Sequence, residues 1–395
     1  MRCLLASLFV FSLAVPCWAA DKAKPNTLAP KEIAEGWILL FDGETTFGWD
    51  TAGKPAVREG ALIYGGDQDI RASTTTAFPR YMLKFEYLIE KTAKDAAPVT
   101  WIADTDSKFE LFAFHGWYSA TFIVGKANIL RATFPLTDNK DVTSGVGFRE
   151  AHTPKFPQPI SFSVPKGNKL SLRNVKLSLM EAKLLFNGKD LSGWKKFDAD
   201  PKRAKSQFVV TKSPWLSITN GPGDLQTTSE WADFVLQLDC RTNGDNLNGG
   251  VFFRCIPGEY QNGYEAQIQN QAAKQPKSYT IDEYDPKTHQ LVAKKKIENW
   301  SQDYGTGAIY RRMPARRAAA KDREWFTMTV AAQGRHIATW VNGIQVLDWT
   351  DNRPENENAR NGCRLKKGPI SLQGHDPTTD LSFRNIRIAD LKEKD

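Results

Sequence analysis

Long hydrophobic runs are almost absent from this sequence of 395 residues. The one extended apolar stretch, residues 4–15, is too short to span a bilayer, and no later segment approaches the necessary length. Arg2 precedes this stretch, and Ala19 and Ala20 follow it as a cleavage site. This is the pattern of a secretory signal peptide. We therefore expect residues 1–20 to be removed and the mature protein to be exported to the periplasm or the extracellular space, with no membrane span.

Cysteine and histidine are also scarce, with five residues of each. Their spacing matches no zinc motif, and neither a serine triad nor a phosphate-binding loop is present, so the sequence predicts no cofactor. After the signal peptide only Cys240, Cys255 and Cys363 remain. Cys240 and Cys255 end successive strand patterns, and a hairpin between them would allow a disulfide in an oxidising compartment. Two unpaired thiols on different faces fit the sequence equally well.

One short segment contains several acidic residues close enough in sequence to be considered as metal ligands. Asp282, Glu283 and Asp285 lie close together in the sequence. Calcium needs several oxygen ligands in a suitable geometry. The favoured interpretation is therefore an exposed acidic turn without a metal, and calcium stays the alternative.

Positive charge is the excess sign, with a formal net charge of +8. Part of it is clustered in one basic segment, at Arg311, Arg312, Arg316, Arg317, Lys321 and Arg323. Such a segment could meet phosphates or anionic glycans. Interleaved aromatics and a nucleic-acid-binding motif are both missing, so we predict no nucleic-acid partner. The favoured interpretation of the segment is a solvated loop.

The sequence contains an internal repeat. Residues 39–49 and 184–194 both contain Leu-Phe-(Asp/Asn)-Gly followed by Gly-Trp. The closing segments also match, because Pro-Ile-Ser occurs at residues 159–161 and again at 369–371, and each is followed by an Arg-Asn pair. Matched openings and closings in the same order predict two copies of one domain. We place a polar leader at 21–35, copy one at 36–181 and the longer copy two at 182–391.

Both copies are expected to be built from strands. Residues 81–87 and 234–239 alternate apolar and polar side chains. Asn342-Gly343 between two apolar runs is a strong hairpin signal. Helical periodicity is scarce, and residues 315–321 are the only candidate helix. The sequence therefore predicts an all-β protein of two tandem antiparallel sandwiches.

Copy two resembles a known family along its whole length. The segments that carry the resemblance are residues 185–194, 248–250, 254, 263–268, 306–310, 325, 341–343, 368–375 and 383–386. They resemble the 3-keto-disaccharide hydrolase domain, long called domain of unknown function 1080. The resemblance implies a concanavalin A-like jelly roll that acts on 3-keto disaccharides or 3-keto glycosides. Copy one resembles the family only at its ends and along one strand.

Polar residues alternate on two strand segments of copy two. Glu265, Gln267 and Gln269 point to one sheet face, and Gln373 and His375 have the same spacing. Because buried polar groups are costly unless paired or wetted, a polar groove for a small-molecule or oligosaccharide substrate is the favoured explanation. A solvent-facing sheet surface is the alternative. The predicted substrate-binding residues are Arg254, Gln267, Gln373, Asn248 and Tyr310.

A ketone at C3 suggests the chemistry, since it acidifies the hydrogen on C2. A base can then remove this proton, the C1 substituent can leave, and water can add, with hydrolysis as the sum. Glu265 and His375 are the predicted base and acid, with Arg254 and Gln267 holding the enolate or sugar hydroxyls. Direct displacement by two carboxylates and glycan binding without turnover are the alternatives. Asn270 departs from the family, which usually carries an acid near that position, and this leaves activity in question.

Copy one has lost most of these polar residues. The aligned pairs, copy one first, are Ser163 with Gln373, Pro165 with His375, Glu110 with Glu265, Phe112 with Gln267 and Ala103 with Arg254. We therefore predict that copy one is a non-catalytic accessory domain.

Overall fold

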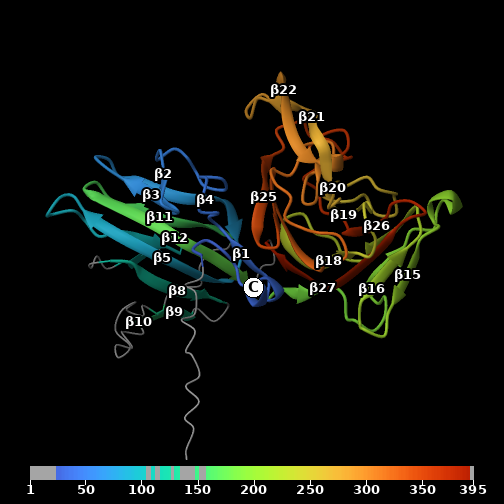
Figure 1. The fold of residues 1–395 in the computed structure, drawn as a ribbon, viewed down its shortest axis with the longest axis horizontal. Coiled ribbons are helices and arrows are strands. Elements are labelled where there is room, and N and C mark those ends of the chain that lie inside the picture. Colours follow the sequence, from blue (N-terminus) through green and yellow to red (C-terminus); the bar gives the residue numbers. More distant parts are fainter. Residues whose placement is uncertain are drawn as a thin grey trace, which may run out of the picture.

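The computed structural model describes residues 24–103, 108–111, 116–125, 129–133, 147–150 and 157–391. The predicted signal peptide lies outside these residues. Within them, no helix has the length and hydrophobicity needed to cross a membrane. Strands dominate both halves of the chain, and each half stacks two antiparallel sheets (Figure 1). The predicted all-β, jelly-roll fold class is confirmed.

The first half contains one short helix and twelve of the described strands. Its elements are α1 (Pro30–Ala34), β1 (Trp37–Leu39), β2 (Ala56–Arg58), β3 (Ala61–Gly65), β4 (Ile70–Phe78), β5 (Tyr81–Lys91), β6 (Thr100–Ile102), β7 (Lys108–Glu110), β8 (Tyr118–Val124), β9 (Ile129–Thr133), β10 (Gly147–Glu150), β11 (Gln158–Val164) and β12 (Asn168–Leu179). One sheet has the order β10-β9-β8-β5-β12-β3-β2, with β1 also on β12, and the other has the order β4-β11-β6-β7.

The second half repeats this plan and adds a long hairpin. Its strands are β13 (Lys183–Leu184), β14 (Trp194–Lys196), β15 (Gln207–Val210), β16 (Leu216–Thr219), β17 (Gly223–Thr227), β18 (Phe234–Thr242), β19 (Gly249–Phe253), β20 (Tyr264–Ile268), β21 (Ala272–Tyr284), β22 (Leu291–Ser301), β23 (Phe326–Gln333), β24 (His336–Val341), β25 (Ile344–Thr350), β26 (Ser371–Gly374) and β27 (Asp380–Asp390). Two 3₁₀ turns, Pro201–Arg203 and Gln302–Tyr304, complete it. The larger sheet has the order β15-β16-β27-β18-β23-β24-β25, with β13 on β27, and the smaller has the order β14-β17-β26-β19-β20.

The repeated motifs make the same contacts in both halves. The indole nitrogen of Trp49 donates to the Leu40 carbonyl, and that of Trp194 donates to the Leu185 carbonyl. The two Arg-Asn pairs each bind one acid on the adjacent central strand. These contacts are Arg173 and Asn174 with Glu86, and Arg384 and Asn385 with Asp239. Both asparagines have a positive φ, of 51° and 53°, at an irregularity in the strand pairing. The repeated residues therefore make equivalent contacts at equivalent positions of the two sandwiches.

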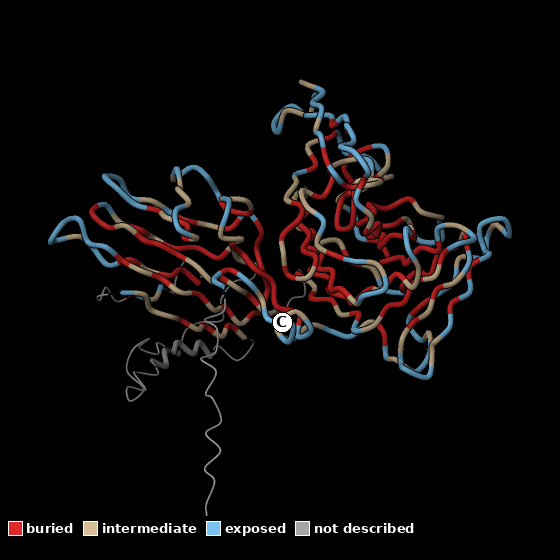
Figure 2. Tube along the Cα trace, in the orientation of Figure 1, coloured by how far each residue is buried: buried red, intermediate tan, exposed pale blue. Residues whose placement is uncertain are grey.

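Each half has its own apolar core, and the cores nearly meet where the halves touch (Figure 2). In the second half, alternate residues of β23 and β24 face inward, while Ala331, Ala338 and Trp340 face outward and join the core of the first half. Trp340 packs against Phe78, with ring centroids 5.9 Å apart. The first half therefore covers the outer face of the larger sheet of the second half, and leaves the smaller sheet uncovered by this contact.

Two local expectations can be corrected. Residues 315–321 are not helical, because this segment runs alongside the ends of β25 and the first half, where Arg316 pairs with Asp42 and Arg317 with Glu44. This part of the basic segment is thus an interdomain contact rather than a solvated loop. Cys240, Cys255 and Cys363 are free and buried, so the structure favours unpaired thiols over a disulfide.

Candidate functional site

The register of the smaller sheet shows which side chains share a face. Ser371 of β26 stands beside Phe252 of β19, which stands beside Glu265 of β20. Two residues along, Asp224, Gln373, Gly250 and Gln267 form the next row on the same face. The intervening row, Leu225, Leu372, Val251 and Ala266, belongs to the core. The strand alternation therefore gives this sheet one apolar and one polar face.

The polar face is covered by loops although it lies outside the sandwich. Asp224, Glu265, Gln267 and Gln373 are all at most 7% exposed. Five oxygens on this face have no hydrogen-bond partner, namely Oδ1 of Asp224 and of Asn248, Oε1 of Gln267 and of Gln373, and Oγ of Ser371. Buried polar atoms without partners are rare in folded proteins and costly. Since four of the five are carboxylate or amide oxygens, which accept, the face suits a ligand that offers several hydrogen-bond donors.

Glu265 lies on β20, the edge strand of the smaller sheet, and its carboxyl reaches back over the polar face. Burial raises its pKa to about 8, against the opposing effect of the Arg360 guanidinium, and the Asp224 carboxyl adds to the rise. Nη2 of Arg360 lies 3.9 Å from Oε2 of Glu265. The carboxyl leans over Gly250 on the adjacent strand, where a side chain would collide with it. A missing side chain on β19 therefore makes the space that the carboxyl fills.

Replacing Gly250 with Ala is expected to lower turnover about 100-fold without unfolding the protein, because small misplacements of a reacting group have effects of this size. The new Cβ would lie 2.7 Å from Oε1 of Glu265, and the flexible side chain would move aside. Gly249→Ala is the matched control, since its Cβ would lie 2.4 Å from Cδ1 of Leu381 in the core. Steady-state kinetics and thermal melts should show lost activity for the first variant and lost stability for the second. Equal activity of Gly250→Ala and the parent protein would contradict the placement of Glu265.

Asp224 is a second buried carboxyl on the same face, and the sequence analysis missed it. Burial raises its pKa to about 7, although its Oδ2 accepts a hydrogen bond from the Gln261 backbone. Asp224 and Gly250 are two strands apart, which corresponds to about 10 Å between their backbones. The Gln373 side chain lies in the row between them. Two titratable carboxyls thus flank a patch of amide groups.

A tight turn closes the open edge of the site. Tyr310 donates its backbone N–H to the Glu265 carbonyl at 3.0 Å, and Gln267 donates to the Ala308 carbonyl at 3.0 Å. The side-chain amide of Gln267 also donates to the Asp303 carbonyl, which fixes its unpartnered oxygen toward the site. A cavity of about 290 Å³ lies here, lined by Glu265, Tyr310, Arg311, Arg312 and Arg360 among others. Glu265 is therefore reachable from this cavity.

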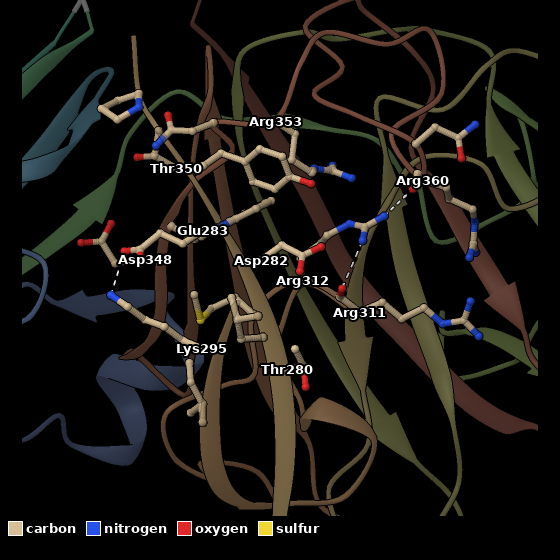
Figure 3. Close-up of a pocket in the computed structure, with 18 residues that line it drawn as sticks. Thr280, Asp282, Glu283, Lys295, Arg311, Arg312, Asp348, Thr350, Arg353 and Arg360 are labelled. Carbon is tan, nitrogen blue, oxygen red and sulfur yellow. Dashed lines mark hydrogen bonds and ion pairs between the residues drawn. The ribbon is translucent and has the colours of Figure 1, made fainter. Parts of the chain in front are cut away.

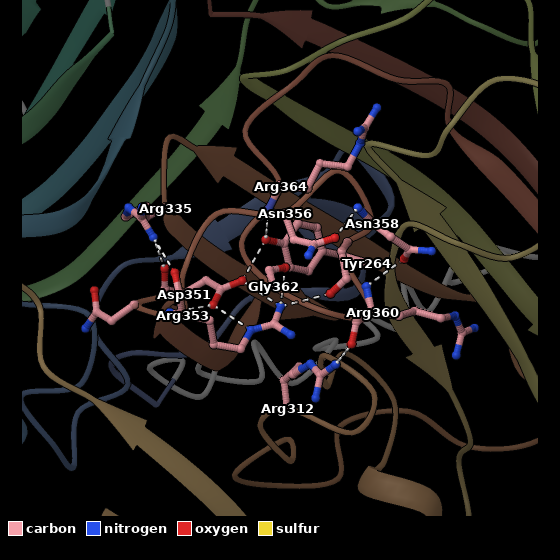
Figure 4. A network of polar contacts seen from close by, with 12 residues as sticks. Tyr264, Arg312, Arg335, Asp351, Arg353, Asn356, Asn358, Arg360, Gly362 and Arg364 are labelled. Atoms are coloured by element: carbon pink, nitrogen blue, oxygen red, sulfur yellow. Dashed lines mark hydrogen bonds and ion pairs between the residues drawn. The ribbon is translucent and has the colours of Figure 1, made fainter. Parts of the chain in front are cut away.

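Arg360 lies on a loop at the end of the sandwich (Figure 4), and its guanidinium lies 3.9 Å from the Glu265 carboxyl. Arg353 supports this loop, because it pairs with Asp351 and donates to the carbonyls of Ala359 and Gly362. Arg312 donates to the Arg360 carbonyl from the other side. Arg360 was not predicted from the sequence, because the polar residues around it resemble those of any surface loop.

Arg254 is contradicted as a substrate-binding residue. It is fully buried, and its guanidinium donates to the carbonyls of Ala232, Gly334 and Arg364 and pairs with Asp233 at 3.0 Å. Its φ of 49° ends β19 and breaks the alternation on which the prediction depended. Arg254 therefore ties loops together away from the polar face.

The structure does not bring His375 to Glu265 either. β26 ends at Gly374, and Nδ1 of His375 contacts Oδ2 of Asp376 at 2.7 Å on the surface. His375 lies one residue past the end of β26, where its imidazole is exposed and bound to Asp376 instead of facing Glu265. The structure therefore does not support the predicted Glu265–His375 acid–base pair. Asp224 is the other candidate, because it lies on the same polar face and its carboxyl is close enough to raise the pKa of Glu265.

The remaining predicted residues are near the site. Gln267 and Gln373 lie on the polar face, and Asn248 precedes β19 on the same alternation, with its buried Oδ1 unpartnered. Tyr310 lines the cavity beside Glu265. Asn270 lies two residues past the end of β20, and its amide contacts the hydroxyls of Thr306 and of Thr242 on the larger sheet. The departure at Asn270 therefore removes no group from the polar face.

The three residues of the acidic segment do not all lie in a turn. Asp282 and Glu283 are exposed on β21 and pair with Lys294 and Lys295 across the β21–β22 hairpin, whereas Asp285 accepts backbone hydrogen bonds from the turn that follows. Among the residues that the structure describes, no three His, Cys, Asp or Glu residues are grouped to hold a metal ion. The predicted acidic turn is therefore right for Asp285 alone.

In the first half, basic residues stand at the two positions that carry carboxyls in the second half. The strand registers place Lys108 at the position of Glu265, Arg71 at that of Asp224, Thr100 at that of Gly250 and Glu110 at that of Gln267. Glu110 therefore does not correspond to Glu265, as the sequence alignment had it. Ala103 corresponds to Phe253, and not to Arg254, because the preceding residue Ile102 corresponds to Phe252. Phe112 lies outside the described residues. Neither carboxyl of the second half has a counterpart at its position.

The second half matches the model of a known domain family. Residues 181–389 match the family model of the 3-keto-alpha-glucoside-1,2-lyase-like domain. Two structures from Parabacteroides distasonis, both provisionally named glycosyl hydrolases, are 20% and 24% identical over 54% of this chain and 98% and 100% of their own, with TM-scores of 0.39 and 0.38. A carbohydrate-binding module from Bacillus subtilis is 13% identical over 50% of this chain and 96% of its own, with a TM-score of 0.31. No curated protein matches the chain. Because the family model spans more than half of the sequence, the chain belongs to the 3-keto-alpha-glucoside-1,2-lyase-like domain family and is a carbohydrate-active, hydrolase-like protein.

Proposed function

We propose that the second half cleaves the C1–oxygen bond of 3-keto glycosides by elimination followed by hydration. One observation carries this proposal: two buried carboxyls with raised pKa values flank acceptor oxygens that have no partner. A sugar offers several hydroxyl donors to such acceptors. Glu265 lines a cavity, and a titratable group with a shifted pKa in such a place is typical of acid–base catalysis. The family match supports the same bond cleavage.

In the proposed mechanism, Asp224 is the base and Glu265 is the acid. The Asp224 carboxylate takes the C2 proton, and the C2–H electron pair forms the C1–C2 double bond. The C1–O bond breaks, and the leaving oxygen takes the proton of Glu265. Water then adds its oxygen to C1 while Glu265 takes its proton, and Asp224 returns a proton to C2. Both carboxyls end in their starting states.

Two features support these roles over the reverse assignment. Oδ2 of Asp224 accepts a hydrogen bond from the backbone N–H of Gln261, which favours the carboxylate form that a base needs. Glu265 lines the cavity at the edge of the sheet, which gives a leaving group a route out of the site. The unpartnered side-chain oxygens of Gln373 and Gln267 would accept hydrogen bonds from hydroxyl groups of the bound sugar. This assignment replaces the predicted role of Glu265 as base.

The test is turnover of 3-keto-trehalose by the full chain. We expect release of free glucose, a slower rate with substrate deuterated at C2, and uptake of solvent deuterium at C2 of the product in D₂O. Glucose release without either isotope signature would favour direct displacement by the two carboxylates. Tight binding without release of glucose would favour a glycan-binding protein. If the chain neither binds nor cleaves 3-keto-trehalose, both the enzymatic and the glycan-binding proposals are rejected.

We further propose that the halves are two copies of one domain and that the first is non-catalytic. The shared strand order and matched Trp and Arg-Asn contacts support the duplication. Lys108 and Arg71 at the carboxyl positions support the loss of acid–base chemistry. Export to the periplasm or beyond stays part of the proposal and rests on the sequence of residues 1–20 alone.

A further inference from the structure

A second, larger cavity adjoins the candidate site. It has a volume of about 550 Å³ and lies between the β21–β22 hairpin and the segment after β25 (Figure 3). It shares Arg311, Arg312, Arg360 and Asn361 with the cavity that contains Glu265. The two cavities therefore meet at an arginine-rich junction. A molecule bound at Glu265 that extends past this junction would enter the larger cavity.

Most charged residues of the larger cavity are already engaged. Three ion pairs are Lys295–Glu283, Lys294–Asp282 and Arg353–Asp351, and the Asp348 carboxylate contacts the His336 ring and accepts a hydrogen bond from the Thr75 hydroxyl. In the described part of the chain, no carboxylate lies within 4.0 Å of the guanidinium of Arg311 or Arg312. Arg312 is half-buried and its guanidinium donates to the backbone carbonyls of Arg311 and Arg360. The junction thus holds two positive charges that no ion pair balances.

The backbone holds these two arginines in place. The N–H groups of Arg312 and Met313 both donate to the Ile309 carbonyl, which makes a tight turn with Arg311 at its tip. Arg311 has a φ of 61°, a left-handed conformation that costs a residue with a side chain about 1–3 kcal/mol. Its guanidinium lies 5.3 Å from the centre of the Tyr310 ring. The turn is hydrogen-bonded directly to β20 through Tyr310 and Glu265, so the arginines keep a fixed position relative to the carboxyl.

We propose that the larger cavity holds the leaving group of the substrate, and that Arg311 and Arg312 bind an anionic oxygen group on it, a carboxylate or a sulfate ester. This inference rests on the proposed function for the position of the bond that breaks, although binding at the junction is measurable without turnover. Guanidinium groups suit such ligands, because their planar donors match carboxylate and sulfate oxygens in pairs. The preferred substrate is then a 3-keto glycoside of an acidic sugar.

The test compares three sugars as ligands of the full chain by calorimetry: glucose, glucuronate and glucose 6-sulfate. We expect either anionic sugar to bind at least about tenfold more tightly than glucose, since hydrogen bonds to charged groups are the stronger class. The preference should weaken as salt is raised. Whichever anion binds more tightly identifies the oxygen group. Equal affinity for all three sugars would overturn the inference.

Variants separate the junction from the general positive charge of the protein. Arg311→Gln removes an exposed charge at the turn tip, and Arg312→Lys keeps the charge but loses the paired donors. Both variants are expected to bind the anionic sugar less tightly than the parent protein does. In Arg311→Gln, the affinity for the anionic sugar should fall close to the affinity for glucose. Lys296→Gln is the control, because it removes the same charge from β22 at a position that does not line the cavity. An equal effect of Lys296→Gln would also overturn the inference. A preserved binding preference without any turnover would instead reject the proposed function alone.

Discussion

Glu265→Gln is expected to lower kcat/KM about 10²–10⁴-fold for 3-keto-trehalose, the range that a positioned acid or base contributes. The loss should be much smaller for 4-nitrophenyl 3-keto-glucoside, because nitrophenolate leaves without a proton. Gln keeps the shape of the side chain that leans over Gly250, so the site geometry is retained. Steady-state kinetics with both substrates provide the measurement.

The matched control for this prediction is Asp224→Asn. If Asp224 is the base, this variant loses activity on both substrates to a similar degree, since the C2 proton must be removed whatever the leaving group. It should also lose deuterium uptake at C2. A nitrophenyl substrate that rescues Asp224→Asn rather than Glu265→Gln would reverse the two roles. If both variants keep the activity of the parent protein, neither carboxyl takes part in catalysis. If the nitrophenyl substrate rescues neither variant, the proposed division into acid and base is rejected.

The raised pKa values also set the pH dependence. The active pair carries one proton, so activity should fall below an apparent pKa of about 7 and above one of about 8, with both values belonging to the pair. Stability should move as well. Between its ordinary pKa of 4.5 and about 8, folded Glu265 binds more proton than the unfolded chain does, so stability falls as pH rises through this window. Glu265→Gln should therefore melt at a higher temperature than the parent at pH 8, with the difference shrinking toward pH 5.

Most of the fold was predictable because it follows from local patterns. Alternation located strands such as β5 and β18, and Asn342-Gly343 forms the predicted hairpin turn, with φ values of 49° and 76°. The Leu-Phe-Asn-Gly opening located the start of the second sandwich. The predicted helix at residues 315–321 was wrong, because the apolar residues there contact other segments and do not form one face of a helix. Tertiary contacts overrode a weak local preference there.

The site was predictable only where a strand continued. Gln267 and Gln373 lie within β20 and β26, and alternation placed both correctly on the face of Glu265. Arg254 and His375 each lie one residue past a strand end, where alternation no longer fixes direction. Asp224 was missed although Asp224 and Gln226 alternate in β17, since this five-residue strand lacks an apolar pattern. Its raised pKa depends on loops that cover it, and these loops have no sequence signature.

Trp340→Ala is expected to destabilise the protein by about 3–5 kcal/mol, the usual cost of deleting a large buried aromatic. Trp340 is fully buried between the halves, and its indole nitrogen donates to the Leu39 carbonyl at 3.0 Å. Removing it would leave a cavity against Phe78 and an unpaired carbonyl. Denaturant unfolding, followed by intrinsic fluorescence and circular dichroism, measures the loss.

The position of Trp340 also predicts how cooperativity changes. The halves have separate cores, so their joint unfolding depends on this apolar contact more than on the ion pairs around it. Arg317→Ala, which removes a half-exposed pair with Glu44, should cost less than about 1 kcal/mol. Trp340→Ala should split one unfolding transition into two, while Arg317→Ala keeps one. Because the polar face lies on the other sheet, far from this contact, the split protein should retain its binding of glycans under native conditions. An unchanged midpoint in Trp340→Ala would show that the two sandwiches are held together by something other than this side chain.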